Sequence, residues 1–327
     1  MNKTLSIALA VAMSSPLYAV AAPTLYGKAN VTYSSVKNSA GNTDTSITEL
    51  ASNASRIGVK GSEKLTDTNL EVIYQAEFQI DIDDGNTAQT DAAKKQTFTQ
   101  RNIFIGVKGG FGTVQAGKFD SPLKTAQNKV DLFNDLYGDI AVLSNSENRP
   151  NNSVMYSSPS MAGFTLYGDV ISSENDKDSN GTSLAATYDN GGLYAALAYD
   201  MDVTVEDTST VRGVLQYTFS NLQLGALVEQ FEPVGDADKL NAAFASAKYS
   251  MGKWALLGQF GQSDIVKGED SDGTTFSVGA DYSLSSNAKL FAFYTNNAFT
   301  KLNVVGALVS KEDNKTDYFG VGMDVKF

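Results

Sequence analysis

Segment 120–150 carries several acidic and basic residues close together in sequence. They are Asp120, Asp131, Asp135, Asp139, Glu147, Lys124, Lys129 and Arg149. Carboxylates that face guanidinium groups across water would create a transverse electric field, which is stronger in a narrow low-dielectric passage than on an open surface. Such a field orders water and filters solutes by charge and polarity. The alternative is an ordinary solvated outer loop.

Composition excludes several other kinds of chemistry. The chain has no histidine, which excludes Ser-His-Asp and Cys-His catalysis and removes the commonest transition-metal ligand. It has no cysteine, so no disulfide holds it together. The net charge of -12 argues against a nucleic-acid surface, because phosphate binding needs clustered lysine and arginine. We therefore predict that the protein is not an enzyme, has no cofactor and binds no nucleic acid.

The first residues have the pattern of a secretory signal peptide. Lys3 gives the positive start, residues 5–13 the apolar stretch, and Ala19-Val20-Ala21 the small-residue cleavage pattern. We expect cleavage after Ala21, which leaves a signal peptide over 1–21 and one mature domain over 22–327. No later stretch approaches the roughly 18 to 20 continuous apolar residues of a transmembrane helix, which excludes a helical membrane protein.

A period of two runs through much of the mature chain. Between residues 70 and 82 every second residue is apolar, and the residues between them are polar except for Ile73. The same alternation recurs over 211–219 and 276–284. It predicts β-strands with one apolar and one polar face. A soluble β-sandwich would share this pattern with a membrane barrel.

Connection lengths separate a barrel from a sandwich. Short breaks rich in Gly, Ser, Asn and Asp fall at 65–69, 109–112, 159–163, 190–192, 220–221, 250–252 and 285–287. Longer polar connections alternate with them at 37–52, 83–96, 120–150, 174–181, 202–208, 232–238, 264–273 and 296–315. Together they predict an all-β, transmembrane antiparallel β-barrel of about 16 strands, with short periplasmic turns and long outer loops.

The same alternation assigns charged residues to the two faces of the wall. Lys28 and Arg56 fall on the polar faces of their strands and should point into the lumen, because a cation on lipid at midplane would cost roughly 2 to 4 kcal/mol. Around Arg101 both faces are apolar, with Ile103 and Ile105 on one and Phe104 on the other. We infer that segment 120–150 folds into the barrel, covers the inner face of this strand and narrows the lumen.

Short motifs along the whole mature chain resemble those of Gram-negative general diffusion porins. They are Leu25-Tyr26-Gly27-Lys28, Ser55-Arg56-Ile57-Gly58-Val59-Lys60-Gly61, Gln75-Ala76-Glu77-Phe78, Arg101-Asn102-Ile103-Phe104-Ile105-Gly106, Gly117-Lys118, Asn148-Arg149-Pro150-Asn151-Asn152-Ser153 and the terminal Phe327. Each is weak alone, whereas their order and spacing together are specific. The resemblance implies a homotrimer in the outer membrane, with one passive channel per subunit for small hydrophilic solutes and ions.

The resemblance also implies which residues form the constriction. In that family a basic cluster on the wall faces acidic residues of an inward-folded third loop, and the matching basic residues are Lys28, Arg56, Arg101 and Arg149, with Glu77 on a neighbouring strand. The acidic partners on segment 120–150 would be among Asp131, Asp135 and Asp139. The Pro-Glu-Phe-Gly-Gly-Asp segment of enterobacterial members is absent there, so the choice among the three stays open.

Several further expectations concern selectivity and partners. Without Lys3 the mature chain has 24 basic residues against 37 acidic ones, which predicts weak cation preference. Asp270 and Asp272 precede Gly273 in a pattern that hints at weak calcium binding, although solvated loop tips are the simpler interpretation. Lipopolysaccharide, outer-membrane lipids and the outer-membrane assembly machinery are the expected partners. The competing functions are a substrate-specific channel and a structural or adhesive barrel.

Overall fold

The computed structural model describes residues 22–41, 43–83, 98–174, 179–235, 238–265, 270–305 and 308–327. The predicted signal peptide lies outside the described residues. The strands are β1 (Thr24–Ala40), β2 (Thr43–Ser52), β3 (Arg56–Lys64), β4 (Glu71–Ile80), β5 (Phe98–Gly109), β6 (Gly112–Lys118), β7 (Ser153–Ser157), β8 (Phe164–Ile171), β9 (Gly181–Asn190), β10 (Leu193–Met201), β11 (Ser209–Phe219), β12 (Leu222–Glu232), β13 (Leu240–Met251), β14 (Trp254–Ser263), β15 (Asp270–Ser283), β16 (Ala288–Val305) and β17 (Leu308–Lys326).

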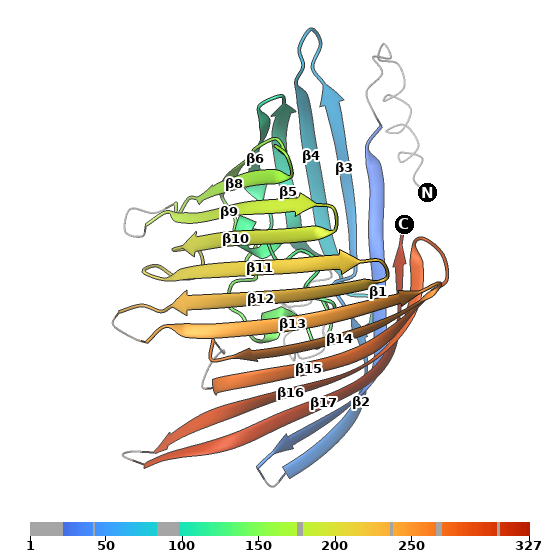
Figure 1. The fold of residues 1–327 in the computed structure, drawn as a ribbon, viewed down its shortest axis with the longest axis vertical. Coiled ribbons are helices and arrows are strands. Elements are labelled where there is room, and N and C mark those ends of the chain that lie inside the picture. Colours follow the sequence, from blue (N-terminus) through green and yellow to red (C-terminus); the bar gives the residue numbers. More distant parts are fainter. Residues whose placement is uncertain are drawn as a thin grey trace, which may run out of the picture.

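These strands form one closed antiparallel ring (Figure 1). Each strand from β3 to β17 pairs with the next one along the chain, and β1 pairs with β17 to join the ends. β2 and β3 both pair with β1 in consecutive stretches, so they are two halves of one strand position. The 17 segments therefore give 16 positions in the wall, and the predicted antiparallel barrel of 16 strands is confirmed.

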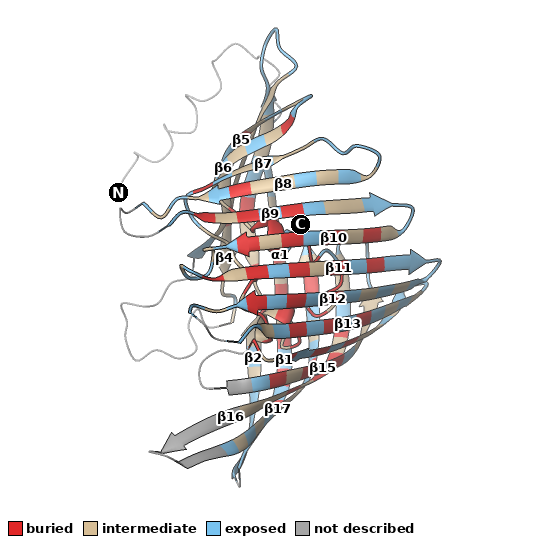
Figure 2. Cartoon of the chain, turned by 60° about the vertical axis from the view of Figure 1, so that its left-hand side comes forward, coloured by how far each residue is buried: buried red, intermediate tan, exposed pale blue. Residues whose placement is uncertain are grey.

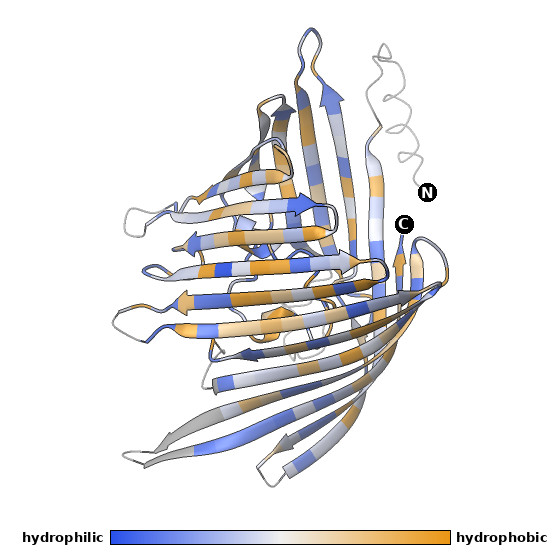
Figure 3. Ribbon diagram, in the orientation of Figure 1, coloured by the Kyte–Doolittle hydropathy of each residue, from blue (hydrophilic) through white to orange (hydrophobic). Residues whose placement is uncertain are grey.

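Side chains on the wall alternate between the lumen and the outside. Figure 2 shows buried and exposed residues alternating along β10 to β13, and Figure 3 shows apolar and polar residues following one another along β11. On β10 the outward Leu197 is 62% exposed, whereas the inward Ala198 is 2% exposed. Large apolar side chains exposed around a whole barrel are suited to contact with lipid rather than water.

The seven predicted short breaks all fall at junctions of consecutive strands, but two of the predicted long loops are wrong. Segments 37–52 and 296–315 are mostly strand, because β1, β2, β16 and β17 continue as long hairpins. The sequence of 37–52 lacks regular apolar alternation, and the Lys37 and Asp44 side chains there are exposed. Backbone pairing persists without that alternation, and β1 stays paired with β17 as far as Ala40 and Asn314.

The connection between β6 and β7, residues 119–152, is the long segment inside the barrel. It contains the helix α1 (Pro122–Thr125) and the 3-10 helix η3 (Ile140–Val142). Ser121 caps α1 by accepting a hydrogen bond from the Lys124 backbone N–H, and Asp139 caps η3. No helix among the described residues is long and apolar enough to cross a membrane.

Apolar packing fixes this inner loop to the wall. Its most deeply buried residues pack on inward residues of β9 to β13; they are Leu123, Val130, Ile140 and Leu143. At the far end Phe133 packs against Phe291 and Phe293 of β16, and Tyr137 stacks on Tyr318 with ring centres 4.0 Å apart. Each fully buried apolar side chain contributes about 1.5 to 3 kcal/mol. The loop is therefore part of the folded core.

Candidate functional site

An interruption of the strand pairing between β2 and β3 positions the first two cations of the site, Lys28 and Arg56. Between β2 and β3 the chain leaves the ladder at Asn53, Ala54 and Ser55, with Ala54 at a φ of 47°. The Ser55 hydroxyl accepts a hydrogen bond from the Asn30 backbone N–H and donates one to the Asn30 carbonyl, which fixes the break. Pairing resumes with Arg56 directly opposite Lys28. Both side chains then project into the lumen.

Asp135 of the inner loop reaches these two cations. Its Oδ2 lies 2.9 Å from Lys28 Nζ and 3.8 Å from Arg56 Nη1. Asp135 has a φ of 66°, in the left-handed region, and its backbone N–H donates to the Asp139 carboxylate. Aspartate tolerates this conformation better than most residues. The turn at Asp135 thus aims one carboxylate across the lumen at the wall.

A β-bulge aims the next group of charges. The register between β4 and β5 shifts between Ala76 and Phe78, so that Arg101 and Asn102 together lie opposite Glu77. Bulges re-aim side chains in this way. In a regular strand Arg101 would point to the same face as Ile105, which is 61% exposed on the outside. The bulge turns it inward instead, and its Nε donates to Glu77 Oε1 at 2.8 Å. The apolar neighbours of Arg101 therefore have two causes: Ile105 faces outward, and Phe104 packs inward on Phe119 of the loop.

Arg149 and Asp120 close the cluster at the base of the loop. Arg149 Nη2 lies 2.8 Å from Asp120 Oδ1, and Lys124 Nζ lies 3.2 Å from the same oxygen. Arg149 Nε also donates to Asn102 Oδ1 at 2.7 Å. Burial opposes ionisation of Asp120, but Lys124 and Arg149 outweigh it and hold the pKa of that carboxyl below its usual value. Asp120 therefore keeps its charge.

These groups form one site, which we call the constriction cluster: Lys28, Arg56, Glu77, Arg101, Asp120, Asp135 and Arg149. All except Lys28 line a cavity of about 350 Å³ between the inner loop and the wall strands β3 to β5. Ala141 is the one apolar residue of the described lining. Each carboxylate of the cluster is shared between two cations. Such a site can orient water and charged solutes but offers no nucleophile or general base activated by a histidine.

Asp131 and Asp139 do not pair with the basic residues of the wall, which the resemblance to porins had left open for them. Asp131 is 7% exposed and accepts hydrogen bonds from the Ile140 backbone N–H and from the Gln259 side chain. Asp139 lines the cavity, but its carboxylate accepts from the backbone N–H groups of Asp135 and Ala141. Neither forms an ion pair within the described part of the chain. Of the three candidates, Asp135 is the one that faces the basic cluster, because the other two carboxylates are needed to shape the loop.

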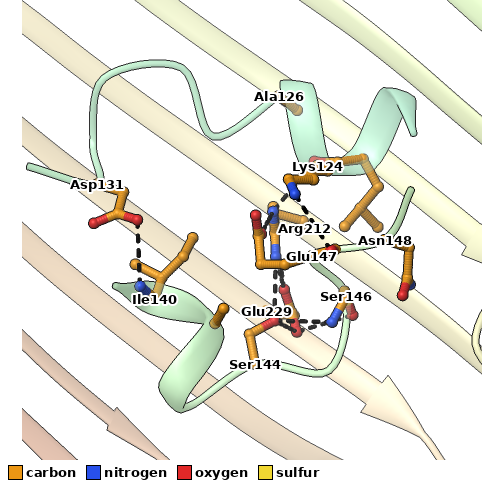
Figure 4. Close-up of polar contacts among 12 residues, drawn as sticks. Lys124, Ala126, Asp131, Ile140, Ser144, Ser146, Glu147, Asn148, Arg212 and Glu229 are labelled. Carbon is orange, nitrogen blue, oxygen red and sulfur yellow. Dashed lines mark hydrogen bonds and ion pairs between the residues drawn. The ribbon is translucent and has the colours of Figure 1, made fainter. Parts of the chain in front are cut away.

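A second set of charges lies on the opposite side of the loop, and we call it the anchor network: Arg212, Glu229, Glu147, Ser144 and Ser146 (Figure 4). Arg212 of β11 is fully buried and donates to Glu229 and Glu147 at 2.5 and 2.7 Å. It also donates to the Leu123 carbonyl and to Ser144 Oγ. One guanidinium thus binds both ends of the loop to the wall.

Burial dominates the ionisation of the loop carboxyls outside the constriction cluster. It raises the pKa of Glu147 above its usual value even though the Arg212 charge lowers it. It also raises the pKa of Asp139 and of Asp131. These groups take up protons at higher pH than ordinary carboxylates.

Sequence reasoning missed the anchor network, although one signal for it was present. In the alternation of 211–219 Arg212 falls on the face opposite Val211 and Gly213, which places it inward. Glu229 likewise falls opposite Val228 on β12. Parity gives the direction of these side chains, but it does not show that the loop would bury them.

A family model described as Gram-negative porin matches residues 6–302. This chain belongs to that family. The major outer membrane protein P.IB of Neisseria gonorrhoeae is 36% identical to this porin over 210 residues, covering 61% of this chain and 56% of that protein. The protein of the same name in Neisseria meningitidis serogroup B is 35% identical over 225 residues, covering 64% and 63%. The matched part of the chain spans little more than half the length of these relatives. The family and the names of these relatives agree that it is an outer-membrane protein.

Solved structures show the same fold at low sequence identity. An anion-selective porin from Comamonas acidovorans superposes with a TM-score of 0.69 at 21% identity, over 94% of this porin and 99% of that chain. OmpF of Salmonella typhi gives a TM-score of 0.69 at 17% identity, over 93% and 97%. The trimer form of OmpT from Vibrio cholerae gives 0.63 at 17% identity, over 94% and 99%. These similarities show that the chain has the same barrel fold as these proteins.

Proposed function

We propose that this porin is a passive diffusion channel for small hydrophilic solutes and ions across the outer membrane. The observation that carries the proposal is the charged cavity between the inner loop and the wall, whose described lining is polar except for Ala141. Cations and carboxylates lie close together in it, which suits a filter for size and polarity. A channel for one substrate class would need an uninterrupted basic ladder or a row of aromatic rings, and this lining mixes both signs of charge.

Single-channel recording in planar bilayers tests the proposal. Purified protein should give stepwise conductance increments that grow in proportion to the salt concentration, as expected of a water-filled pore. Liposome swelling should show sugars entering at rates that fall steeply with their size. Membranes that stay silent at every protein concentration would refute the proposal. Uptake of one sugar much faster than its isomers would favour a substrate-specific channel.

We also propose weak cation preference. Around the cavity and the adjoining lumen surface the charges almost balance: the cations are Lys28, Arg56, Arg101, Lys124, Arg149, Lys289 and Lys326, and the carboxylates are Glu77, Asp120, Asp135, Asp139, Glu147 and Asp324. The acidic surplus of the rest of the chain then sets the sign of the preference. Screening limits its strength, since the Debye length is about 8 Å at physiological salt. Reversal potentials in a KCl gradient test this, and anion preference would contradict it.

The assembly and the partners are proposals of the same kind. A homotrimer is supported by the trimer form of OmpT and by an apolar groove of about 610 Å³ on the outer wall, lined by Tyr33, Trp254, Tyr282 and their neighbours. Mass measurement of the detergent-solubilised protein tests it. Lipopolysaccharide and the assembly machinery stay predicted partners. Weak calcium binding at Asp270 and Asp272 also stays a prediction.

A further inference from the structure

One side chain of the wall holds the turn 131–140 of the inner loop, which carries Asp135. Gln259 of β14 is 3% exposed and points inward. Its Oε1 accepts a hydrogen bond from the Leu132 backbone N–H at 2.7 Å, and its Nε2 donates to the Gly138 carbonyl at 2.8 Å. Nε2 also donates to Asp131 Oδ1 at 3.2 Å, so both N–H groups of the amide are in use. A single amide therefore ties the entry and the exit of the turn to the wall.

Asp131 closes the same turn from within the loop. Its carboxylate accepts hydrogen bonds from the backbone N–H groups of Phe133 and Ile140, the second of which is drawn in Figure 4. It also accepts one from the Asn134 side chain. Asp135 lies between these points, at the left-handed residue of the turn. The position of the Asp135 carboxylate therefore depends on how the two ends of the turn are held.

The turn follows one row of inward wall residues that are paired in register across β12 to β15: Gly225, Ser246, Gln259 and Ser277. At one end of the row, a Cβ added to Gly225 would come within 3.0 Å of Val130 Cγ2. At the other end, a Cβ added to Gly138 of the loop would collide with the Ser277 hydroxyl. Small residues on either side of Gln259 thus let the backbone of the loop approach the wall closely enough to reach the amide.

The turn has further contacts with the wall at Tyr137. Asn297 Nδ2 donates to the Tyr137 carbonyl at 2.9 Å, and the Tyr137 hydroxyl donates to the Glu49 carboxylate. Both act at one residue near the exit of the turn, and neither joins the exit to the entry. Gln259 does so, and as a neutral side chain it adds no charge to the lumen beside the constriction cluster.

We propose that Gln259 is a positioning residue of the channel, because its clamp on the turn sets how closely Asp135 faces the wall cations. Asp135 Oδ2 lies 2.9 Å from Lys28 Nζ, and their attraction falls with distance and with the water that enters between them. Without the amide, the Leu132 N–H and the Gly138 carbonyl lose their partners, and the turn moves to satisfy them with water. The inference rests on the proposed diffusion channel and names the side chain that holds its charge filter in place.

A double-mutant cycle in planar bilayers tests the proposal. Reversal potentials in a KCl gradient give the cation-to-anion permeability ratio of the wild type, Gln259→Leu, Asp135→Asn and the double variant. Gln259→Leu alone should lower the ratio toward that of Asp135→Asn. In the Gln259→Leu background, Asp135→Asn should then change the ratio little, because a carboxylate that has left the cations no longer contributes. A loss of stability that leaves Asp135 in place would instead give additive effects.

Gln223→Leu is the matched control. Gln223 of β12 donates to the Lys129 carbonyl at 2.9 Å, outside the clamped turn. This variant also loses one hydrogen bond between the wall and the loop, but it should keep the wild-type permeability ratio and the full effect of Asp135→Asn. An equal fall of the ratio in Gln223→Leu would overturn the specific role of Gln259.

A second variant decides the case in which Gln259→Leu does not fold. Gly138→Ala pushes the exit of the turn away from Ser277 and should lower the permeability ratio in the same way, and Ser277→Gly should restore the ratio in the double variant. Additive effects of Gln259→Leu and Asp135→Asn, or a wild-type ratio in Gly138→Ala, would overturn the positioning role while the channel function stands. Wild-type protein that never conducts would refute the channel itself.

Discussion

The constriction cluster and the anchor network use the same residue types for opposite purposes, and water makes the difference. Arg212 and Glu229 have fully buried side chains, whereas those of the constriction cluster are 9 to 23% exposed. A buried ion pair gains strong attraction but has lost its hydration, so removing one partner is severe. A hydrated pair is worth little to stability and leaves its field free to act on solutes.

The two regions also differ in what holds them in place. The anchor network lies among the most deeply packed apolar residues of the loop, including Leu123 and Leu143. The constriction cluster faces a cavity and depends on backbone devices instead: the break before Arg56, the bulge at Glu77 and the left-handed turn at Asp135. Stability and permeation should therefore respond to separate substitutions.

The largest effect is expected for Arg212→Met, which tests whether the anchor network is structural. The substitution leaves Glu147 and Glu229 buried without a cation and should destabilise the fold by about 3 to 5 kcal/mol. It should also free the base of the loop, so that single-channel records become noisier and the mean conductance rises. Thermal unfolding and bilayer recording measure the two effects.

A matched variant separates charge from packing in this test. Adding Glu147→Gln and Glu229→Gln to Arg212→Met removes the unpaired charges and should recover much of the lost stability. A single Arg212→Met variant as stable and as quiet as the wild type would contradict the anchoring role.

Asp135→Asn should change ion permeation with little change in stability, whereas Arg212→Met should mainly change stability. Asparagine keeps the size of the side chain and tolerates the left-handed backbone, while Lys28 and Arg56 lose a shared counter-charge. The interaction of two unit charges at 4 Å in water is about 1 kcal/mol, so the cation-to-anion permeability ratio should fall by up to about fivefold. Reversal potentials measure this. Asp44→Asn makes the same change in net charge far from the cavity and should leave the ratio unaltered.

The smallest expected effect concerns pH. The raised pKa of Asp139 means that this carboxyl protonates at higher pH than ordinary carboxylates, which removes a negative charge from the cavity. Cation preference should therefore begin to fall on acidification before the ordinary carboxylates titrate, and the lowered pKa of Asp120 should delay the last part of the change. Reversal potentials across a pH series measure it. Asp139→Asn should have a smaller early step, because Glu147 lines the same cavity and its pKa is also raised. An unchanged profile in that variant would contradict the assignment.

Much of the barrel could be predicted because its signals are local. A period of two along each strand decides which face meets lipid, and it predicted the inward direction of Lys28 and Arg56. The alternation of short and long connections predicted the strand count. Prediction from this pattern fails for strands that lack it, and so the polar hairpins of 37–52 and 296–315 were predicted as loops. Their strands exist because neighbouring strands supply the backbone partners.

The sequence by itself thus determined the alternation of apolar and polar residues and the presence of a charged segment long enough to enter the lumen. The signal peptide over 1–21 stays a prediction. Only the tertiary structure decided which charges meet. The bulge that turns Arg101 inward, the turn that aims Asp135 rather than Asp131, and the burial of Arg212 against Glu147 each depend on contacts between residues far apart in the chain. Alternation repeats every two residues and is readable locally, whereas the path of the loop follows from packing on strands formed long after it in sequence.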